Sequence, residues 1–326
     1  DLASNKNGVN KIETSYNGSK SIDVDFKRFS FDETKHLNRY VDYEFYYKNK
    51  KRIQKLFIEK NNPLSILKAH TNNGALKIES DTSSIYKIIV SDFKGNQSEL
   101  KIPIKGAFKK LINTKLNNPD LQHISASEEI FLEKDHVSVQ ISKNTFYEDV
   151  YLDFNVDKEI AKIHTPTIPL DKSFTLTFNV SKYSEAEKQS LYIANVEYPK
   201  YPRYQYTRKK DSTFFITTKI LGNYTLLSDT IKPTIKLLYL QDQQWISNAK
   251  TLKVKIADID SGIKNYRATI DGEWILMQYN HKKRILTYNF SDKKLVGSKH
   301  IFKIVVSDNV GNTNELSATF FKKQIN

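Results

Sequence analysis

The sequence contains no cysteine and only one methionine, and glycine and proline are scarce, with 10 and 8 residues among 326. The lack of cysteine excludes thiol catalysis, Cys-ligated zinc, iron–sulfur clusters and disulfides, although it does not identify a compartment. No apolar run approaches the roughly 18 residues that would cross a bilayer, and no secretory signal peptide is present. Because the first residue is Asp1 and not Met, we expect a processed chain or part of a longer protein.

The remaining composition is that of a folded, basic protein. Apolar residues make up 39% of the chain and aromatic residues 12%, including 19 Tyr and 18 Phe. This content supports packed cores, and the length suggests two or three domains. The formal net charge of +14 favours anionic partners. Because the positive charge is spread along the chain and no nucleic-acid-binding motif accompanies it, we do not expect nucleic acid as the partner.

Alternation of polar and apolar residues is the dominant local pattern. It is clearest in Val137–Ile141 (VSVQI), Phe174–Val180 (FTLTFNV) and Thr251–Ile256 (TLKVKI). A period of two with β-branched and aromatic residues predicts half-buried strands. The dipeptide Asp271–Gly272 lies between two such runs and predicts a two-residue hairpin turn. Short strands at this spacing are typical of immunoglobulin-like β-sandwiches.

An internal repeat divides the chain. Residues 85–100 (IYKIIVSDFKGNQSEL) match residues 301–316 (IFKIVVSDNVGNTNEL) at an offset of 216, with 10 of 16 positions identical. A shorter match relates Asn17–Gly18 to Asp271–Gly272 at an offset of 254. Since the two offsets differ by 38, the first copy is expected to carry that many additional residues between its matching segments.

The additional residues differ in character from the strands. Ser30–Glu33 fits the S-x-x-E capping box, in which two side chains satisfy free amides at a helix start. The stretch 34–57 shows no strand alternation, and Asn61–Pro63 is a stop signal. We therefore predict a helical insertion at about residues 30–60. Its basic run, 48–60, is interpreted as a solvated helix face, with contact to an anionic envelope polymer or lipid headgroups as the alternative.

These features predict a mainly β fold of tandem immunoglobulin-like β-sandwich domains. We assign residues 1–106 to an incomplete first domain with the helical insertion, 107–228 to a linker and a second sandwich, and 229–326 to a C-terminal sandwich. The strands expected at 234–257 have no counterpart in the first copy. The first domain is therefore expected to be truncated at its N-terminus, with its opening strands encoded upstream.

No catalytic constellation is predicted from the residues. None of the seven histidines lies in an H-x-H, H-E-x-x-H or H-x-x-x-D pattern. Hydrolytic zinc needs three convergent ligands and an open position, so scattered surface histidines are the favoured interpretation. No G-x-S-x-G elbow and no Gly-rich phosphate loop occurs either. We therefore expect no catalytic residue and no cofactor in this chain.

Two Asp-containing loops are candidates for calcium. The loop 257–262 contains Asp258 and Asp260, and the loop 307–312 contains Asp308 and Asn312. In an immunoglobulin-like sandwich these loops lie at the same end, so their oxygens could meet around Ca²⁺. Calcium usually takes six or more oxygens, and this spacing guarantees few of them. The favoured interpretation is therefore that the aspartates cap turn amides.

Residues 198–210 (YPKYPRYQYTRKK) combine aromatic and cationic side chains. Aromatic faces beside cations can stack on sugars and attract anionic groups. The favoured interpretation is instead a Pro-broken edge strand whose Lys and Arg residues discourage aggregation. The candidate ligand-binding residues of this segment are Tyr201, Arg203, Tyr204, Tyr206 and Arg208.

Several segments along the whole chain resemble one family. They are Asp1–Val9 (DLASNKNGV), Phe29–Glu33 (FSFDE), Arg52–Phe57 (RIQKLF), Asp229–Pro233 (DTIKP), Trp245–Ser247 (WIS), Asp258–Ile263 (DIDSGI), Tyr266–Ile275 (YRATIDGEWI) and Asp308–Asn312 (DNVGN). The D-G-E-W and D-x-x-G-N pieces are individually generic to bacterial immunoglobulin-like domains. In combination and order, the segments resemble the C-terminal, noncatalytic region of flavobacterial lysostaphin-like peptidoglycan zinc metalloendopeptidases.

In that family, an N-terminal β-rich peptidase domain binds zinc through H-x-x-x-D and H-x-H and cuts peptide cross-links in peptidoglycan. No position of this chain matches those ligands, so the resemblance implies a catalytic, zinc-binding domain upstream of residue 1. The chain itself would be an accessory positioning region, exported to the periplasm or outer envelope. Its implied partners are peptidoglycan or another anionic envelope polymer, and the upstream peptidase domain. The alternatives are a stand-alone envelope adhesion or glycan-binding protein and an enzyme of unrecognised type.

Overall fold

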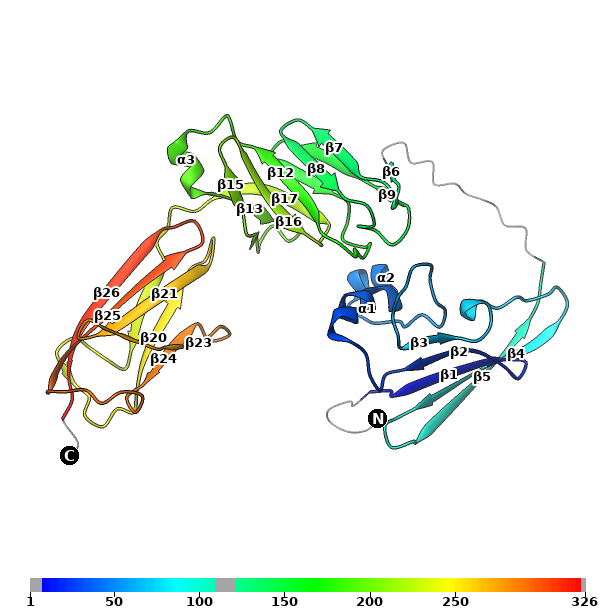
Figure 1. The fold of residues 1–326 in the computed structure, drawn as a ribbon, viewed down its shortest axis with the longest axis horizontal. Helices are drawn as coiled ribbons and strands as arrows, with labels where there is room; N and C mark the ends of the chain where they lie inside the picture. The colour runs from blue at the N-terminus through cyan, green and yellow to red at the C-terminus, as the bar shows by residue number, and fades with distance from the viewer. Residues whose placement is uncertain (1–7, 109–120, 324–326) are drawn as a thin grey trace.

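The computed structural model describes residues 8–108 and 121–323 (Figure 1). They form a mainly β structure of tandem immunoglobulin-like β-sandwich type, as the alternation predicts. Three successive units, called here the first, middle and C-terminal domains, are built on separate sheets. In Figure 1 the middle domain lies between the other two. Residues 109–120, at the start of the linker expected within 107–228, lie outside the described residues, as do residues 1–7 of the segment Asp1–Val9.

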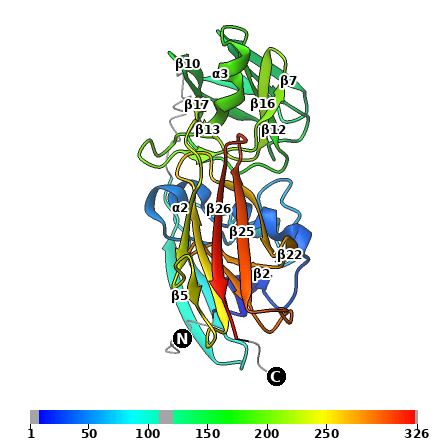
Figure 2. The same cartoon turned by 90° about the vertical axis from the view of Figure 1, so that its left-hand side faces the viewer.

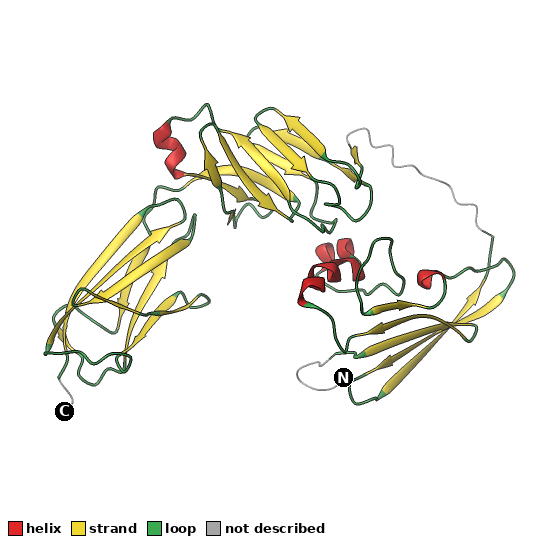
Figure 3. Cartoon of the chain, viewed as in Figure 1, coloured by secondary structure: helices red, strands yellow, loops and turns green. Residues whose placement is uncertain are grey.

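The first domain contains one five-stranded antiparallel sheet in the order β3-β2-β1-β4-β5. Its strands are β1 (Lys11–Tyr16), β2 (Ser19–Asp25), β3 (Leu67–Ala69), β4 (Ser83–Ser91) and β5 (Gln97–Lys105). Its short helical segments are η1 (Phe31–His36), α1 (Leu37–Tyr40), α2 (Tyr43–Asn49) and η2 (Asn72–Gly74). Most of the helical structure within residues 8–108 and 121–323 is in this domain (Figure 3).

The predicted helical insertion is present and begins where the capping box predicts. Ser30 and Glu33 satisfy each other's backbone amides at the start of η1. Helix α2 ends at Lys50, which adopts a left-handed conformation with φ of 58°. The basic run 48–60 therefore lies mostly beyond the helix, and its interpretation as a helix face is wrong. A left-handed residue at this position terminates a helix because the backbone turns away from the helix axis.

The middle domain is a two-layered sandwich of five-stranded sheets, in the orders β10-β11-β17-β13-β14 and β15-β16-β12-β8-β7, with a small β6-β9 pair. Inward side chains such as Val139, Leu176 and Ile193 are fully buried between the layers. Its elements are β6 (Gln122–Ile124), β7 (Ile130–Lys134), β8 (Val137–Ile141), β9 (Val150–Leu152), β10 (Phe154–Asp157), β11 (Ile160–Ile163), β12 (Phe174–Asn179), α3 (Glu185–Ser190), β13 (Leu191–Asn195), β14 (Arg203–Tyr204), β15 (Arg208–Lys210), β16 (Thr213–Thr218) and β17 (Gly222–Ser228).

The C-terminal domain packs a four-stranded sheet, β18-β20-β24-β23, against a five-stranded sheet, β19-β26-β25-β21-β22. Strands β25 and β26 run side by side along its length (Figure 2). Val254, Leu286 and Ile304 are among its fully buried core residues. Its strands are β18 (Thr234–Leu238), β19 (Gln244–Trp245), β20 (Thr251–Ala257), β21 (Ile263–Ile270), β22 (Glu273–Ile275), β23 (Gln278–Asn280), β24 (Ile285–Asn289), β25 (Lys299–Asp308) and β26 (Thr313–Phe321).

The internal repeat corresponds to equivalent strand pairings in the first and C-terminal domains. Tyr16 of β1 pairs with Tyr86 of β4, and Ile270 of β21 pairs with Phe302 of β25. Tyr16 corresponds to Ile270 by the offset of 254, and Tyr86 corresponds to Phe302 by the offset of 216. Strands β4 and β5 likewise share the register of β25 and β26. The two domains therefore contain the same four-stranded unit.

The predicted hairpin turn at Asp271–Gly272 is confirmed, with positive φ angles of 54° and 82°. Its counterpart Asn17–Gly18 has φ angles of 46° and 83°. Both residues of such a turn need the left-handed region, which Asn, Asp and Gly tolerate best. Among the residues that the structure describes, none of the helices has the length and apolarity to cross a membrane.

Candidate metal centre at the junction of the middle and C-terminal domains

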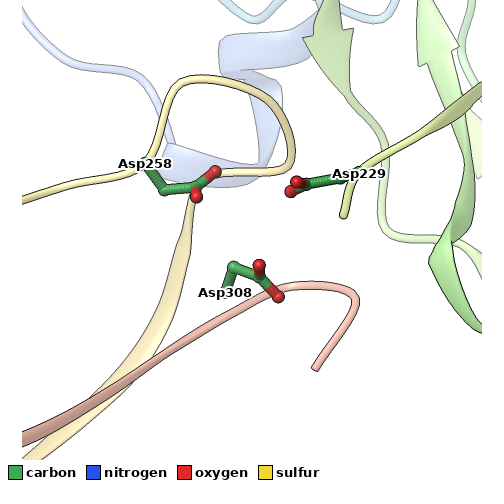
Figure 4. A group of neighbouring side chains, drawn as sticks. All are labelled: Asp229, Asp258 and Asp308. Atoms are coloured by element: carbon green, nitrogen blue, oxygen red, sulfur yellow. The ribbon is translucent and has the colours of Figure 1, made fainter. Parts of the chain in front are cut away.

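Three aspartates converge where the middle domain meets the C-terminal domain (Figure 4). Asp229 follows β17, Asp258 follows β20, and Asp308 ends β25. One carboxylate oxygen of each lies within 4.8 Å of the others. Across residues 8–108 and 121–323, this is the only convergence of three or more such His, Asp or Glu ligand atoms. The candidate site therefore draws on three loops and two domains.

The Asp308 carboxylate organises the turn between β25 and β26. Its Oδ1 accepts hydrogen bonds from the backbone N–H groups of Val310 (3.0 Å), Gly311 (2.7 Å) and Asn312 (2.8 Å). Its Oδ2 accepts one from Asn312 Nδ2 at 2.7 Å. Asp308 thus performs the turn-capping role that the sequence favours.

The equivalent turn of the first domain shows that this capping does not require an acidic cluster. Asp92 corresponds to Asp308 in the repeat. Its Oδ1 accepts hydrogen bonds from the N–H groups of Lys94 (2.8 Å) and Asn96 (2.9 Å), and its Oδ2 accepts one from Asn96 Nδ2 (2.7 Å). No group of three acidic ligands includes Asp92 within the part of the chain that the structure describes. The additional carboxylates around Asp308 therefore call for a separate explanation.

Asp229 links the end of the middle domain to two loops of the C-terminal domain. Its Oδ2 accepts a hydrogen bond from the backbone N–H of Ser261 at 3.0 Å, and its Oδ1 accepts one from Ile231 N–H at 3.0 Å. Its backbone carbonyl accepts a hydrogen bond from Asn312 Nδ2 at 3.1 Å. The side chain is only 1% exposed. The Asp229 carboxylate is therefore held in place by backbone groups that follow it in the chain, one of them in a loop of the C-terminal domain.

Asp258 is the most accessible member and the one whose ionisation the cluster opposes. Its Oδ1 accepts a hydrogen bond from the backbone N–H of Gly262 at 2.7 Å. Burial raises the pKa of the Asp258 carboxyl, and the negative charges of Asp229 and Asp308 raise it further, while the Gly262 N–H acts in the opposite direction. A raised carboxyl pKa means that the ionised form is disfavoured here.

These carboxylates have no cationic partner among the residues that the structure describes. In the described part of the chain, none of the ion pairs includes Asp229, Asp258 or Asp308. The pKa of the nearby Tyr192 is raised to about 12, mainly by burial and further by the charges of Asp260, Asp229 and Asp258. Buried charges are normally paired or coordinate metals.

The cluster meets the geometric requirement for a calcium ion. Ca²⁺ binds oxygens at 2.3–2.6 Å, so two oxygens on one ion lie at most about 5 Å apart. The oxygens of Asp229, Asp258 and Asp308 satisfy this limit. Three carboxylates supply three to six of the six to eight oxygens that calcium takes, and backbone carbonyls or water would complete the set.

The structure brings together two of the four residues proposed as calcium ligands from the sequence. Asp258 and Asp308 meet, but the Asp260 carboxylate is not part of the convergence. Asn312 donates its amide N–H to Asp308 and to the Asp229 carbonyl, so it orders the site as a donor. Sequence analysis missed Asp229. The only available signal was its place at the domain boundary, because the first copy has no matching residue.

The Tyr- and Arg-containing segment is divided between the two sheets of the middle domain. Strand β14 is at the edge of one sheet of the middle domain, and β15 is at the edge of the other, which confirms the edge-strand interpretation. Tyr204 packs against Tyr192 with 5.5 Å between ring centroids. Tyr201 and Tyr206 are 76% and 73% exposed. The exposed Arg203 belongs to β14, and Arg208 of β15 lies over a Phe ring. The ligand role of these residues stays a prediction.

Comparisons with known proteins concern the fold. A family model described as a Zu5-like domain matches residues 121–229, less than half of the chain. The chain is similar to fibronectin(III)-like modules of CbhA from Clostridium thermocellum, with 15% identity over 47% of this chain and 86% of that one and a TM-score of 0.24. No curated protein sequence matches the chain.

Two further solved structures show distant similarity. The first is an endo-β-1,4-mannanase from Thermotoga petrophila, with 12% identity over 30% of this chain and 21% of that one and a TM-score of 0.25. The second is SGBP-B from a mixed-linkage glucan utilization locus of Bacteroides ovatus, in complex with a mixed-linkage heptasaccharide, with 7% identity over 96% of this chain and 60% of that one and a TM-score of 0.16. The matched part is thus about a fifth of the mannanase chain.

Proposed function

We propose that the chain is the noncatalytic positioning region of a cell-wall peptidoglycan metalloendopeptidase that acts in the periplasm or outer envelope. Its role is to hold a separate zinc-binding peptidase domain at a set position relative to peptidoglycan or a partner. The observation that carries this proposal is that polar contacts of buried side chains join the domains at both junctions. A positioning region needs junctions of this kind, because free linkers would not transmit a defined geometry.

At the first junction, Arg39 is the central residue. The side chain is 6% exposed, although its guanidinium is charged at all physiological pH values. Its Nη1 donates a hydrogen bond to Glu148 Oε1 of the middle domain at 2.8 Å, and its Nη2 donates one to the Lys60 carbonyl at 3.0 Å. The guanidinium also lies 5.0 Å from the centre of the Tyr147 ring. Arg39 thus connects the helical insertion to the middle domain.

Three further hydrogen bonds join the first domain to the middle domain. The buried His36 shares a 2.7 Å hydrogen bond with the Tyr147 hydroxyl. Asn61 Nδ2 donates a hydrogen bond of 2.8 Å to the Tyr147 carbonyl. Tyr47 donates its hydroxyl proton to Glu197 Oε1 at 2.7 Å. The helical insertion therefore serves as the docking element of the first domain.

At the second junction, Asp229 has the corresponding role. It follows the middle domain directly, and its side chain and carbonyl accept hydrogen bonds from Ser261 and Asn312 of the C-terminal domain. Asn314 Nδ2 adds a hydrogen bond of 2.8 Å to the Pro233 carbonyl. The connection between the two sandwiches is thus held by loops of the second one.

The enzymatic part of this proposal is tested with purified chain and isolated sacculi. The expected result is no zinc-dependent release of muropeptides, since the proposal assigns hydrolysis to a separate domain. Release that requires zinc and is lost with a chelator would contradict it. A lysostaphin-like enzyme on the same sacculi provides the positive control.

A second candidate function, glycan binding, is favoured by one observation. Tyr201 and Tyr206 expose most of their rings on a strongly basic segment, and exposed aromatic rings can stack on sugars. Co-sedimentation with sacculi separates the two functions. Retention that is lost in the Tyr201→Ala/Tyr206→Ala variant but kept in Tyr239→Ala, an even more exposed tyrosine in the C-terminal domain, favours glycan binding. No retention of the unmodified chain favours the positioning role.

A further inference from the structure

In the first domain, one face of the sheet is exposed along β5 and only half-buried along the neighbouring β4. The corresponding face of the C-terminal domain is buried. Leu100 and Ile102 of β5 are 56% and 37% exposed. They pair with Ile88 and Tyr86 of β4, so these four side chains share one face. By the internal repeat, Ile102 corresponds to Ala318, which is 4% exposed.

In the C-terminal domain, one continuous segment covers this face. Strand β18 packs against β26, the counterpart of β5. Strand β20 contributes Val254 and Ile256, both fully buried, to the shared core. Between these two strands the chain forms β19, which pairs in parallel with the edge of β26. Residues 234–257 thus supply both the cover of the face and a strand for its edge.

The helical insertion covers this face only as far as β4, where Ile88 packs against its cluster, and it leaves the β5 side chains Leu100 and Ile102 exposed. Tyr40, Leu64 and Ile66 pack against Ile12 of β1 and Val24 of β2, at the other half of the sheet. Strand β5 is at the end of the sheet within the described residues. An apolar face beside an unpaired strand edge is a site for added β-structure.

We propose that the open face of β4 and β5 binds a polypeptide segment of the β18–β20 kind. Such a segment has two antiparallel strands with alternating apolar residues, joined by a connection that pairs with the edge of β5. Two observations specify this occupant: the register shared by the two domains, and the way in which residues 234–257 cover the equivalent face. A lipid surface could cover the apolar residues but could not satisfy the backbone groups of the β5 edge. This inference is independent of the proposed role in peptidoglycan hydrolysis.

The test uses the full chain and a synthetic peptide of residues 231–258 as the probe. Hydrogen exchange followed by mass spectrometry should show slower exchange in Gln97–Lys105 when the peptide is present. Exchange in β25 and β26 should not change, because their domain already contains this segment. Since a free peptide of this composition can self-associate, the same segment joined ahead of Asp1 by a flexible linker gives a second measurement.

Matched variants on opposite faces of one sheet identify the binding surface. Leu100→Lys/Ile102→Lys should weaken peptide binding at least tenfold. Ile85→Lys should leave it unchanged, because Ile85 is similarly exposed but pairs with Pro103 on the other face. If a chain variant fails to fold, the replacements Val254→Lys and Ile256→Lys are made in the peptide instead. This altered peptide should also bind the unmodified chain more weakly.

Three results would overturn the proposal. The first is unchanged exchange of β5 with both the free and the tethered segment. The second is protection that survives the Leu100→Lys/Ile102→Lys replacement. The third is a dimer of the unmodified chain in light scattering that this double variant converts to a monomer, because the face would then bind a second copy of the chain.

Discussion

The backbone N–H of Ser261 donates a hydrogen bond of 3.0 Å to the Oδ2 atom of Asp229. This bond connects the residue that follows the last strand of the middle domain to a loop of the C-terminal domain. The same carboxylate is a member of the acidic cluster with Asp258 and Asp308. A cation bound by the cluster would therefore contact a side chain that also holds the second junction.

Calcium should bind the full chain and raise its melting temperature. Three carboxylates without a cationic partner, two of them buried, gain most from a divalent cation with flexible oxygen coordination. At a free calcium concentration one hundred times Kd, the expected stabilisation is about 2.7 kcal/mol. Calorimetric titration and thermal unfolding in EDTA and in calcium measure the effect.

The control for calcium binding is provided by the internal repeat. Asp258→Asn and Asp308→Asn should each abolish the heat of binding, whereas Asp92→Asn should not, since Asp92 caps the equivalent turn outside the cluster. If the unmodified chain shows neither heat nor a shift in melting temperature, the aspartates serve only as turn caps.

Without calcium, the Asp258→Asn variant should be more stable than the unmodified chain at pH 7. Burial and the charges of Asp229 and Asp308 raise the pKa of Asp258 in the folded state. This means that the free energy of unfolding falls as the pH rises from about 4 through that raised pKa. Asn removes the charge and can still accept the Gly262 hydrogen bond. The difference in melting temperature should disappear near pH 3.5.

The matching residue of the first domain should behave in the opposite way. The side chain and backbone of Asn96, with other backbone donors, lower the pKa of Asp92, so its ionised form stabilises the fold above about pH 4. Asp92→Asn should therefore lower the melting temperature at pH 7. A common direction for both variants would contradict this electrostatic account.

Replacement of Arg39 by Met should loosen the first junction. Arg39 pairs with Glu148 and with Glu59, whose side chains are 52% and 20% exposed. Because the charges left behind are partly solvated, we expect a loss of about 1–3 kcal/mol, less than for a fully buried pair. Lys35→Met is the control, because both side chains of its pair with Asp171 are partly exposed and such a pair is worth less than about 1 kcal/mol. Denaturant unfolding measures both. An equal decrease in the free energy of unfolding for the two variants would show that burial of Arg39 adds nothing to the strength of its ion pairs.

The first junction should also weaken as the pH falls below about 6.5. Burial lowers the pKa of His36. The negative charge of Asp171 opposes this shift, and the positive charge of Lys35 adds to it. Because the folded state favours neutral His36, its contribution to stability is complete above the unfolded pKa and is lost as the pH falls through the folded one. Hydrogen exchange of η1 and α1, corrected for intrinsic rates, should therefore accelerate at pH 5.5.

Two histidine variants check the origin of this pH effect. His36→Gln should remove most of the pH dependence, because Gln carries no proton that titrates. His123→Gln, at a half-exposed site, should leave the dependence intact. An unaltered pH dependence in His36→Gln would assign the effect to another group.

Local patterns in the sequence predicted much of the fold. The alternation at Thr251–Ile256 predicted β20, and the Ser30–Glu33 capping box predicted the start of η1. The repeat predicted that the two outer domains share a strand arrangement, and the pairings of Tyr16 with Tyr86 and of Ile270 with Phe302 agree with it. These features depend on neighbours in the chain or on direct similarity, and both are visible in a single sequence.

Contacts between domains were not predictable in the same way. Arg39 and Glu148 are 109 residues apart, and no local pattern marks either as part of a junction. Asp229 joins Asp258 and Asp308 only after the sandwich has formed, and the repeat could not identify it because the first copy lacks an equivalent. The end of α2 at Lys50 depends on a single left-handed residue, which composition does not reveal.

The central claim, that the three domains form an array with fixed junctions, is tested most directly by a distance measurement between its ends. The chain has no native cysteine, so spin labels at Lys77→Cys and Lys282→Cys, both at exposed positions, report only on these two sites. In calcium, double electron–electron resonance should give a single narrow distance distribution that broadens in the Arg39→Met and Asp229→Ala variants. A broad distribution in the otherwise unmodified chain, insensitive to both replacements, would contradict the account.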